Sequence, residues 1–197
     1  DRLINNISLI SFVQGLDIGG KVYNGYTIVS NSESKEVVLE ENIYINKAKV
    51  KKSFRRIDIY IEDNYPVLYN SNTNKTIFQN KKESDEQYAV PVLVNYVPSN
   101  IYKTLIKSLA KIDDSNYKMI SEIEYSVEKY NDKVVDEERF LLRMIDGNTI
   151  YVNLVNIEKL NKYQEIYAAL QDKGTLYLDS SSKNYVFKKY SEEKSES

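Results

Sequence analysis

The sequence contains no cysteine, no histidine and no tryptophan among its 197 residues. The absence of cysteine excludes disulfide bonds and thiolate chemistry. The absence of histidine excludes more, because histidine is the commonest general base near neutral pH and the commonest transition-metal ligand. Histidine-dependent triads and H-E-x-x-H zinc sites are therefore ruled out, while catalysis by carboxylates or by a serine–lysine pair stays open.

Long apolar runs and a dominant charge are missing too. No run of about 18 apolar residues occurs, so no segment predicts a membrane-spanning helix. The 27 basic and 29 acidic residues nearly balance, which gives no electrostatic reason to expect nucleic acid as a ligand. Because the chain begins at Asp1 without a methionine, we expect a soluble fragment of a longer protein, with any membrane anchor upstream.

The N-terminal part of the sequence is rich in predicted strands. Residues 3–13 are apolar enough for a strand, glycines from Gly15 to Gly25 mark turns, and Lys35–Glu41 could form a short helix. The runs Lys47–Phe54 and Arg56–Tyr60 alternate in polarity and predict two adjacent strands.

A proline at position 66 then marks a boundary, since proline cannot donate within a central ladder. Beyond it, Val67–Tyr69 and Thr76–Phe78 flank a polar turn and predict a hairpin. Ala89–Val97 is apolar and extended, and Pro98 ends it.

A helical period follows. Ser99 or Asn100 can cap a helix that runs to about Ile112. Its predicted buried stripe is Ile101, Leu105, Leu109 and Ile112. On another face, Lys103, Lys107 and Lys111 lie four residues apart and form either a basic ligand patch or a solvated helix face.

Acidic side chains dominate the next segment. Ile120–Val127 alternates as a strand and places Glu122 and Glu124 on one face. Paired carboxylates can serve acid–base catalysis, but a strand with one solvated face explains them equally well. Asn131–Glu138 is charged throughout and predicts a loop.

A hairpin is the clearest prediction. Phe140–Ile145 and Thr149–Leu154 alternate in polarity, and Asp146-Gly147-Asn148 joins them with residues that tolerate positive φ. The triplet lacks the D-x-D-x-D-G spacing and the distal glutamate of a calcium loop, which favours the hairpin.

The last elements are a helix and two strands. Asn156 can cap a helix from about Ile157 to Lys173, and Gly174 is expected to end it. Thr175–Asp179 predicts a strand, and Asn184–Tyr190 predicts the final one.

The final strand has no later strand to pair with, since residues 191–197 carry no apolar side chain and should be disordered. An unpaired strand is either a hazard to be covered or a docking site for another chain. Its aromatic residues could pack the core while its lysines protect the edge, or both could meet a partner.

These segments, taken in order, resemble the FtsQ/DivIB family. The resemblance covers roughly Ala89 to Tyr190 and rests on ISEIEYS, a strand that ends in Met-Ile-Asp-Gly-Asn, a return strand, a helix with Lys-Tyr-x-x-Ile, Lys-Gly, and a strand that reaches Leu-Asp. The sequence resembles the DivIB type of this family that occurs in low-GC Gram-positive bacteria. Upstream, Lys47–Tyr69 is similar to the last two strands of the family's POTRA domain, whereas the first forty or so residues match poorly.

The resemblance implies an α+β fold in two domains. Residues 1–63 would form a POTRA-like domain with a divergent N-terminal half, and residues 64–190 a mixed β-sheet domain with two main helices. Residues 191–197 would be a disordered tail. It also implies a single transmembrane helix before Asp1, with everything described here on the extracytoplasmic side of the cell membrane.

The resemblance further implies a non-enzymatic scaffold of the divisome, without a cofactor or a metal. Such a scaffold binds FtsL-like and FtsB/DivIC-like partners by β-strand addition to its last strand and so regulates septal cell-wall synthesis. The partner contacts fall on Asn184, Tyr185, Val186, Phe187, Lys188, Lys189 and Tyr190. The alternative is a secreted carbohydrate-binding or adhesion domain that uses some of the 18 tyrosines.

Overall fold

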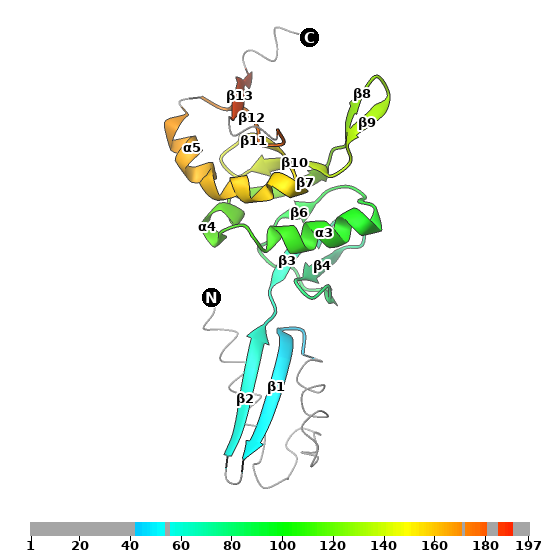
Figure 1. Cartoon of the computed structure of the whole chain (residues 1–197), viewed down its shortest axis with the longest axis vertical. Helices are drawn as coiled ribbons and strands as arrows, with labels where there is room; N and C mark the ends of the chain where they lie inside the picture. Colours follow the sequence, from blue (N-terminus) through cyan, green and yellow to red (C-terminus); the bar gives the residue numbers. More distant parts are fainter. Residues whose placement is uncertain (1–41, 54–55, 171, 181–184, 191–197) are drawn as a thin grey trace. The chain divides into compact units, whose positions relative to one another are not determined.

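The computed structural model of the protein describes residues 42–53, 56–170, 172–180 and 185–190. The chain divides into two compact units, unit 1 up to Tyr65 and unit 2 from Pro66 onward. Each unit is described by itself, with the element labels of Figure 1.

The described part of unit 1 is an antiparallel hairpin of β1 (Ile45–Ser53) and β2 (Arg56–Asp63). The polarity alternation of the sequence correctly predicts both strands. At the open end of the hairpin, buried Asn64 donates its side-chain amide to the carbonyl of Ile43 at 2.6 Å. The strand expected at 3–13, the glycine turns and the helix expected at 35–41 lie outside the described residues.

Unit 2 is built on a mixed sheet of nine strands in the order β13-β12-β11-β10-β7-β6-β3-β4-β5. The pairs β3–β6, β6–β7 and β11–β12 are parallel, and the other pairs are antiparallel. The strands are β3 (Pro66–Asn70), β4 (Lys75–Phe78), β5 (Glu83–Ser84), β6 (Val92–Leu93), β7 (Ile120–Tyr125), β10 (Arg139–Met144), β11 (Thr149–Asn153), β12 (Gly174–Tyr177) and β13 (Val186–Lys189).

Helical segments accompany this sheet: α3 (Ser99–Leu109), α4 (Asp114–Tyr117), the 3-10 helix η1 (Leu154–Lys162) and α5 (Tyr163–Ala169). The apolar stripes of α3 and η1 share one core cluster with the inward residues of the sheet. In Figure 1, α3 and the η1–α5 segment run across the body of unit 2. All four predicted stripe residues of α3, Ile101, Leu105, Leu109 and Ile112, are buried.

The two predicted hairpins of unit 2 are confirmed. β3 pairs with β4, and β10 pairs with β11 across the Asp146-Gly147-Asn148 turn, where Gly147 has φ +90°. Alternate residues of the two strands are buried: Phe140, Leu142, Met144, Ile150, Val152 and Leu154. The period of two in the sequence thus matches the burial pattern of this hairpin.

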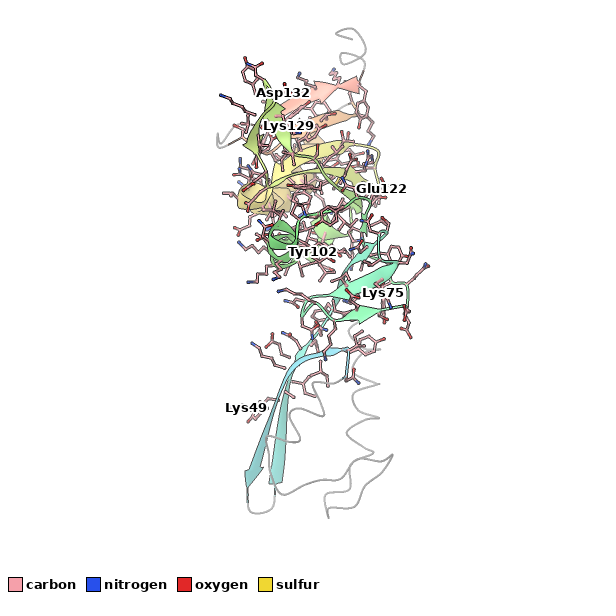
Figure 2. The ribbon with its side chains drawn as sticks, turned by 90° about the vertical axis from the view of Figure 1, so that its right-hand side faces the viewer. Lys49, Lys75, Tyr102, Glu122, Lys129 and Asp132 are labelled. Carbon is pink, nitrogen blue, oxygen red and sulfur yellow. The ribbon has the colours of Figure 1, made fainter. Side chains whose placement is uncertain are left out.

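The prediction of a loop at 131–138 is wrong. β8 (Glu128–Tyr130) and β9 (Lys133–Asp136) form a separate two-stranded hairpin, with Asn131 and Asp132 at positive φ in its turn. Both strands are almost wholly exposed, so no apolar alternation marks them in the sequence. The hairpin projects from the body of unit 2, and Figure 2 labels Lys129 and Asp132 on it.

The prediction of one helix from Ile157 to Lys173 is also wrong. The helical segment begins at Leu154 as η1 and ends with α5 at Ala169. Its cap is Asn153, whose side chain accepts the main-chain N–H of Asn156 at 3.0 Å. The asparagine three residues earlier takes the capping role because it ends β11 in an extended conformation.

Three further boundaries shift. Gly174 does not end a helix but begins β12, α3 ends at Leu109 rather than near Ile112, and β7 ends at Tyr125 rather than Val127. Strand structure within the predicted extended segment 89–97 is confined to β6, of two residues. Helix and strand ends depend on hydrogen bonds to distant residues, which local sequence does not encode.

Candidate functional site: the β13 edge

β13 lies at one edge of the nine-stranded sheet and, among the described residues, has β12 as its only strand neighbour. It pairs with β12 antiparallel, from Gly174 opposite Lys189 to Tyr177 opposite Val186. The structure thus places most of the predicted partner-binding segment on an edge strand. Asn184, the first residue of that prediction, lies outside the described residues.

The hydrogen-bond pattern of β13 identifies which main-chain groups face away from β12. The N–H of Tyr190 donates to the carbonyl of Lys173 at 3.3 Å. Because hydrogen-bonded and non-hydrogen-bonded pairs alternate in an antiparallel ladder, Lys188 and Val186 bond to β12 and Phe187 does not. The N–H and C=O of Phe187 therefore point toward the outer side of the edge, where an added strand would pair.

A close backbone approach holds β13 against β12. A Cβ atom at Gly174 would lie 2.1 Å from the carbonyl oxygen of Lys188 and 2.8 Å from the Phe187 ring. Only a residue without a side chain permits this spacing. Gly174 is thus required for the edge to form.

Asn148 fixes the start of β12 from the other side. Its side-chain oxygen accepts the N–H of Gly174 at 3.0 Å, and its amide donates to the hydroxyl of Tyr163 at 3.0 Å. Tyr163 in turn donates to Asp146 at 2.7 Å. The β10–β11 turn, the α5 helix and β12 are therefore joined by one buried polar network.

The side chains of β13 divide between the two faces of the sheet. Phe187 lies opposite buried Leu176 and packs against the core. Val186 and Tyr185 are more solvent-exposed, at 50% and 39% of their surface. Phe187 therefore faces the core, whereas Tyr185 does not belong to the residues that pack against the core cluster.

The polar residues of β13 and the adjoining Tyr190 have partners within unit 2. The ammonium group of Lys189 forms a 2.6 Å ion pair with Asp172. The hydroxyl of Tyr190 donates to the carbonyl of Gly147 at 3.1 Å. Lys188 lies with its Nζ 5.9 Å from the centre of the Tyr177 ring. The edge strand is therefore anchored at its C-terminal end, while Val186 and Tyr185 offer exposed apolar surface.

Tyrosines also line the sheet face opposite the core. Tyr151 and Tyr177 stack at 5.3 Å with an interplanar angle of 23°. The guanidinium carbon of Arg139 lies 3.8 Å from the centre of the Tyr151 ring, and Lys188 approaches the other ring. Cations thus occupy this pair, which makes it a poor platform for a sugar ring.

The paired carboxylates of β7 are engaged in ion pairs. Arg143, on the neighbouring strand β10, contacts Glu122 at 3.3 Å and Glu124 at 2.8 Å. Figure 2 labels Glu122 on this part of unit 2. A cross-strand arginine between two glutamates is an arrangement typical of a solvated sheet face.

Asp146 likewise has a structural role. It accepts the Tyr163 hydroxyl and the N–H of Asn148, and burial, assisted by the bond to Asp146, raises the pKa of Tyr163 above its ordinary value. Within residues 42–53, 56–170, 172–180 and 185–190, no cluster of three or more acidic side chains is arranged to hold a metal ion.

Gly174 and Asn148 are the two residues of the site that sequence reasoning assigned differently. Gly174 was expected as a helix stop and Asn148 only as a turn residue. The signal for Gly174 was its position directly before a strand, which also fits a close backbone approach. The roles of both residues depend on contacts 14 or more positions away in the sequence, such as that of Gly174 with Lys188.

In the part of the chain that the structure describes, no helix is long and apolar enough to cross a membrane.

Comparison with known proteins gives one informative relative. No family model matches the chain. The cell division protein DivIB of Bacillus subtilis (strain 168) is 26% identical to it over 161 residues, which cover 76% of this chain and 59% of that protein. The chain thus spans less than two thirds of the length of this relative.

A solved structure is also similar, the major extracytoplasmic domain of the trans isomer of DivIB from Geobacillus stearothermophilus. It is 19% identical, has a TM-score of 0.41, and covers 53% of this chain and 92% of its own. The sequence similarity to the Bacillus subtilis protein agrees with the segment order described above. The chain is therefore similar in sequence to DivIB over 76% of its length.

Proposed function

We propose that this chain is the extracytoplasmic part of a membrane-anchored cell-division protein. In this proposal it acts as a non-enzymatic scaffold that binds FtsL-like and FtsB/DivIC-like membrane proteins and so regulates septal wall synthesis. Binding takes place by β-strand addition along β13. The similarity to DivIB supports the role in division, and the geometry of β13 supports the mode of binding.

The single observation that carries the proposal is the outward direction of the Phe187 main chain. Strand addition gains its affinity from main-chain hydrogen bonds and its specificity from alternate side chains. Phe187 supplies an N–H and a C=O on the outer side of the edge, and exposed Val186 and Tyr185 supply apolar surface beside them.

The charges of β13 indicate the kind of partner strand. Lys189 is already paired with Asp172, whereas Lys188 has an aromatic neighbour at 5.9 Å. A partner carboxylate opposite Lys188 would gain a charge pair at the rim of the interface. We therefore expect an acidic residue in the partner strand, whose main effect is on the rate of association.

Measuring partner binding to two proline variants tests the proposal. Val186→Pro removes a ladder hydrogen bond and distorts β13, so it should weaken binding of a DivIC-type extracytoplasmic region by about tenfold or more. Val134→Pro is the matched control, because Val134 is 55% exposed in β9, which belongs to a different sheet. It should leave binding unchanged.

Phe187→Ala is the second arm of this experiment. It removes the aromatic side chain that packs against the core beneath the edge and should weaken binding less than Val186→Pro does. Circular dichroism establishes that each variant is folded. Unchanged affinity in folded Val186→Pro and Phe187→Ala would contradict strand addition at β13.

For unit 1 we propose a POTRA-like domain with a divergent N-terminal half. The support is the β1–β2 hairpin, which occupies the place of the last two POTRA strands in the family resemblance. A solution structure of the whole chain tests this: two helices packed on the β1–β2 hairpin would support it, and an unrelated arrangement would contradict it.

A further inference from the structure

Unit 2 contains a pocket of about 340 Å³ at the other end of the sheet from β13. It lies between the N-terminal turn of α3 and the strands β3 and β4. Buried aliphatic side chains of Ile77, Leu93 and Val97 contribute to its lining. Its volume is at the small end of the range for ligand sites, which suits a ligand the size of one or two amino acids.

Hydrogen-bond donors converge on this pocket from separate segments. The side-chain oxygen of Asn70 accepts the N–H of Asn72 at 3.0 Å, and Asn70 lines the pocket. Ser99 is the first residue of α3 and lines the pocket. Among the described residues, no side chain caps this end of α3, and the first turn of the helix contains no acidic residue. An oxyanion in the pocket would find N–H and O–H groups in both walls.

Tyr102 provides a donor that is already desolvated. Its hydroxyl is buried and, among the described residues, has no hydrogen-bond partner. Burial is the main cause that raises the pKa of Tyr102; the neighbouring Asn70 side chain lowers this pKa, and the charge of Glu83 raises it further. A buried polar group without a partner is costly, and a bound ligand would remove that cost.

Lysines complete the lining. Lys103, in the first turns of α3, and Lys81, in the loop after β4, both line the pocket. Lys81 adopts φ +69°, a conformation that residues other than glycine seldom take. Glu83 adds one carboxylate to these two ammonium groups, so the pocket has a small positive balance rather than the dense positive charge that a polyphosphate would require.

We propose that this pocket binds a free carboxylate carried by a small aliphatic residue, as in an amino acid or at the C-terminus of a short peptide. Lys81, Lys103 and the Tyr102 hydroxyl hold the carboxylate, and the aliphatic side chain contacts Ile77, Leu93 and Val97. Glu83 would favour a ligand that also carries an ammonium group, and this feature separates a free amino acid from a peptide terminus.

Titration of the isotope-labelled 197-residue chain by NMR tests the proposal. The probes are N-acetylleucine, its carboxamide and free leucine, and the signals followed are the amides of residues 99–103. N-acetylleucine should shift these signals saturably, and the carboxamide should bind about tenfold more weakly because it lacks the charge. If free leucine binds more tightly than N-acetylleucine, the ligand class is an amino acid. If N-acetylleucine binds more tightly, the ligand class is the C-terminus of a peptide.

Three variants locate the site. Lys103→Ala and Tyr102→Phe should each weaken N-acetylleucine binding by about tenfold. Lys107→Ala is the control, since Lys107 is exposed one turn further along α3 and does not line the pocket. Tyr102→Phe should leave the unfolding midpoint unchanged or slightly raised, because the hydroxyl has no partner to lose.

Equal binding of the acid and the carboxamide would overturn the proposal, as would the absence of any saturable shift in residues 99–103. Equal weakening by Lys107→Ala and Lys103→Ala would also overturn it, since the effect would then come from helix charge alone. None of these residues belongs to β13, so the result is independent of partner binding at that edge.

Discussion

The two edges of the nine-stranded sheet differ in how they end. β5 has two residues, and the chain beyond it folds back, with the Thr76 hydroxyl bonded to the carbonyl of Glu86 at 2.6 Å and Tyr88 packed edge-on against Phe78 at 5.5 Å. β13 has four residues and directs the main chain of Phe187 outward. A two-residue edge strand offers little main chain for pairing with another chain, and a four-residue edge strand offers more.

The difference teaches that exposure of an edge is controlled locally. Gly174 and Asn148 hold β12 and β13 in register, so the position of β13 at the edge of the described sheet is a built feature of unit 2. At β5 the exposed Lys75–Asp85 ion pair of 2.6 Å lies beside the shortened strand.

Gly174→Ala should damage the β13 edge most. The new Cβ would meet the Lys188 carbonyl, a backbone atom that cannot rotate away, so β13 must separate from β12. We expect a loss of about 3 kcal/mol in the free energy of unfolding, measured by urea denaturation. Gly147→Ala, with φ +90° but open space around it, should cost about 1 kcal/mol. The reverse order would contradict the role given to Gly174.

Asn148→Ala should weaken the anchoring of β12. It leaves the Gly174 N–H and one bond of the Tyr163 hydroxyl unsatisfied in a buried site. The expected cost is about 2 kcal/mol, again from urea denaturation. The matched control is Asn100→Ala on α3, where the side chain is exposed, and its effect should be close to zero. An equal loss of unfolding free energy in the two variants would show that Asn148 does not anchor β12.

Alkaline pH should lower the free energy of unfolding of unit 2 through the ionisation of two buried tyrosines. Burial is the main cause that raises the pKa of Tyr163, near β12, and of Tyr117, which bonds to the carbonyl of Val67 in β3. Their protonated forms are favoured by the fold, so the stabilisation is complete below the unfolded pKa of about 10 and falls as the pH rises above it.

The slope of that loss is at most about 1.4 kcal/mol per pH unit for each tyrosine. Urea denaturation at about pH 9, 10 and 11 measures it. Tyr163→Phe and Tyr117→Phe should each reduce the slope. A slope that neither variant changes would assign the pH dependence to other groups.

Asp85→Asn should have the smallest effect. It removes the exposed ion pair with Lys75 beside β5, and exposed pairs contribute little to stability. We expect an unfolding midpoint indistinguishable from that of the unaltered chain and unaltered binding of the DivIC-type partner. Weakened binding would place the partner at the β5 edge instead of at β13.

Most of the local structure of the described residues followed from polarity alternation and turn chemistry. The β1–β2 and β10–β11 hairpins and the buried stripe of α3 were predicted because their signals lie within a few residues of each other. The β8–β9 hairpin was missed because its strands carry charged and exposed residues on both faces.

The roles of single residues were harder to predict. Gly174 acts through a carbonyl 14 residues further along the chain, and Asn148 through partners 15 and 26 residues away. The small pocket gathers residues from β3 to α3, which no motif links. The sequence did predict the segment 184–190 as a final strand, and its role in partner binding stays a prediction.

Amide hydrogen exchange at β13 tests the central claim most directly. In the free chain, the N–H of Phe187 should exchange faster than that of Lys188, because Phe187 points outward and Lys188 bonds to β12. Addition of a DivIC-type extracytoplasmic region should slow exchange at Phe187 and leave Lys188 nearly unchanged. Binding that leaves the Phe187 amide unprotected would contradict strand addition at this edge.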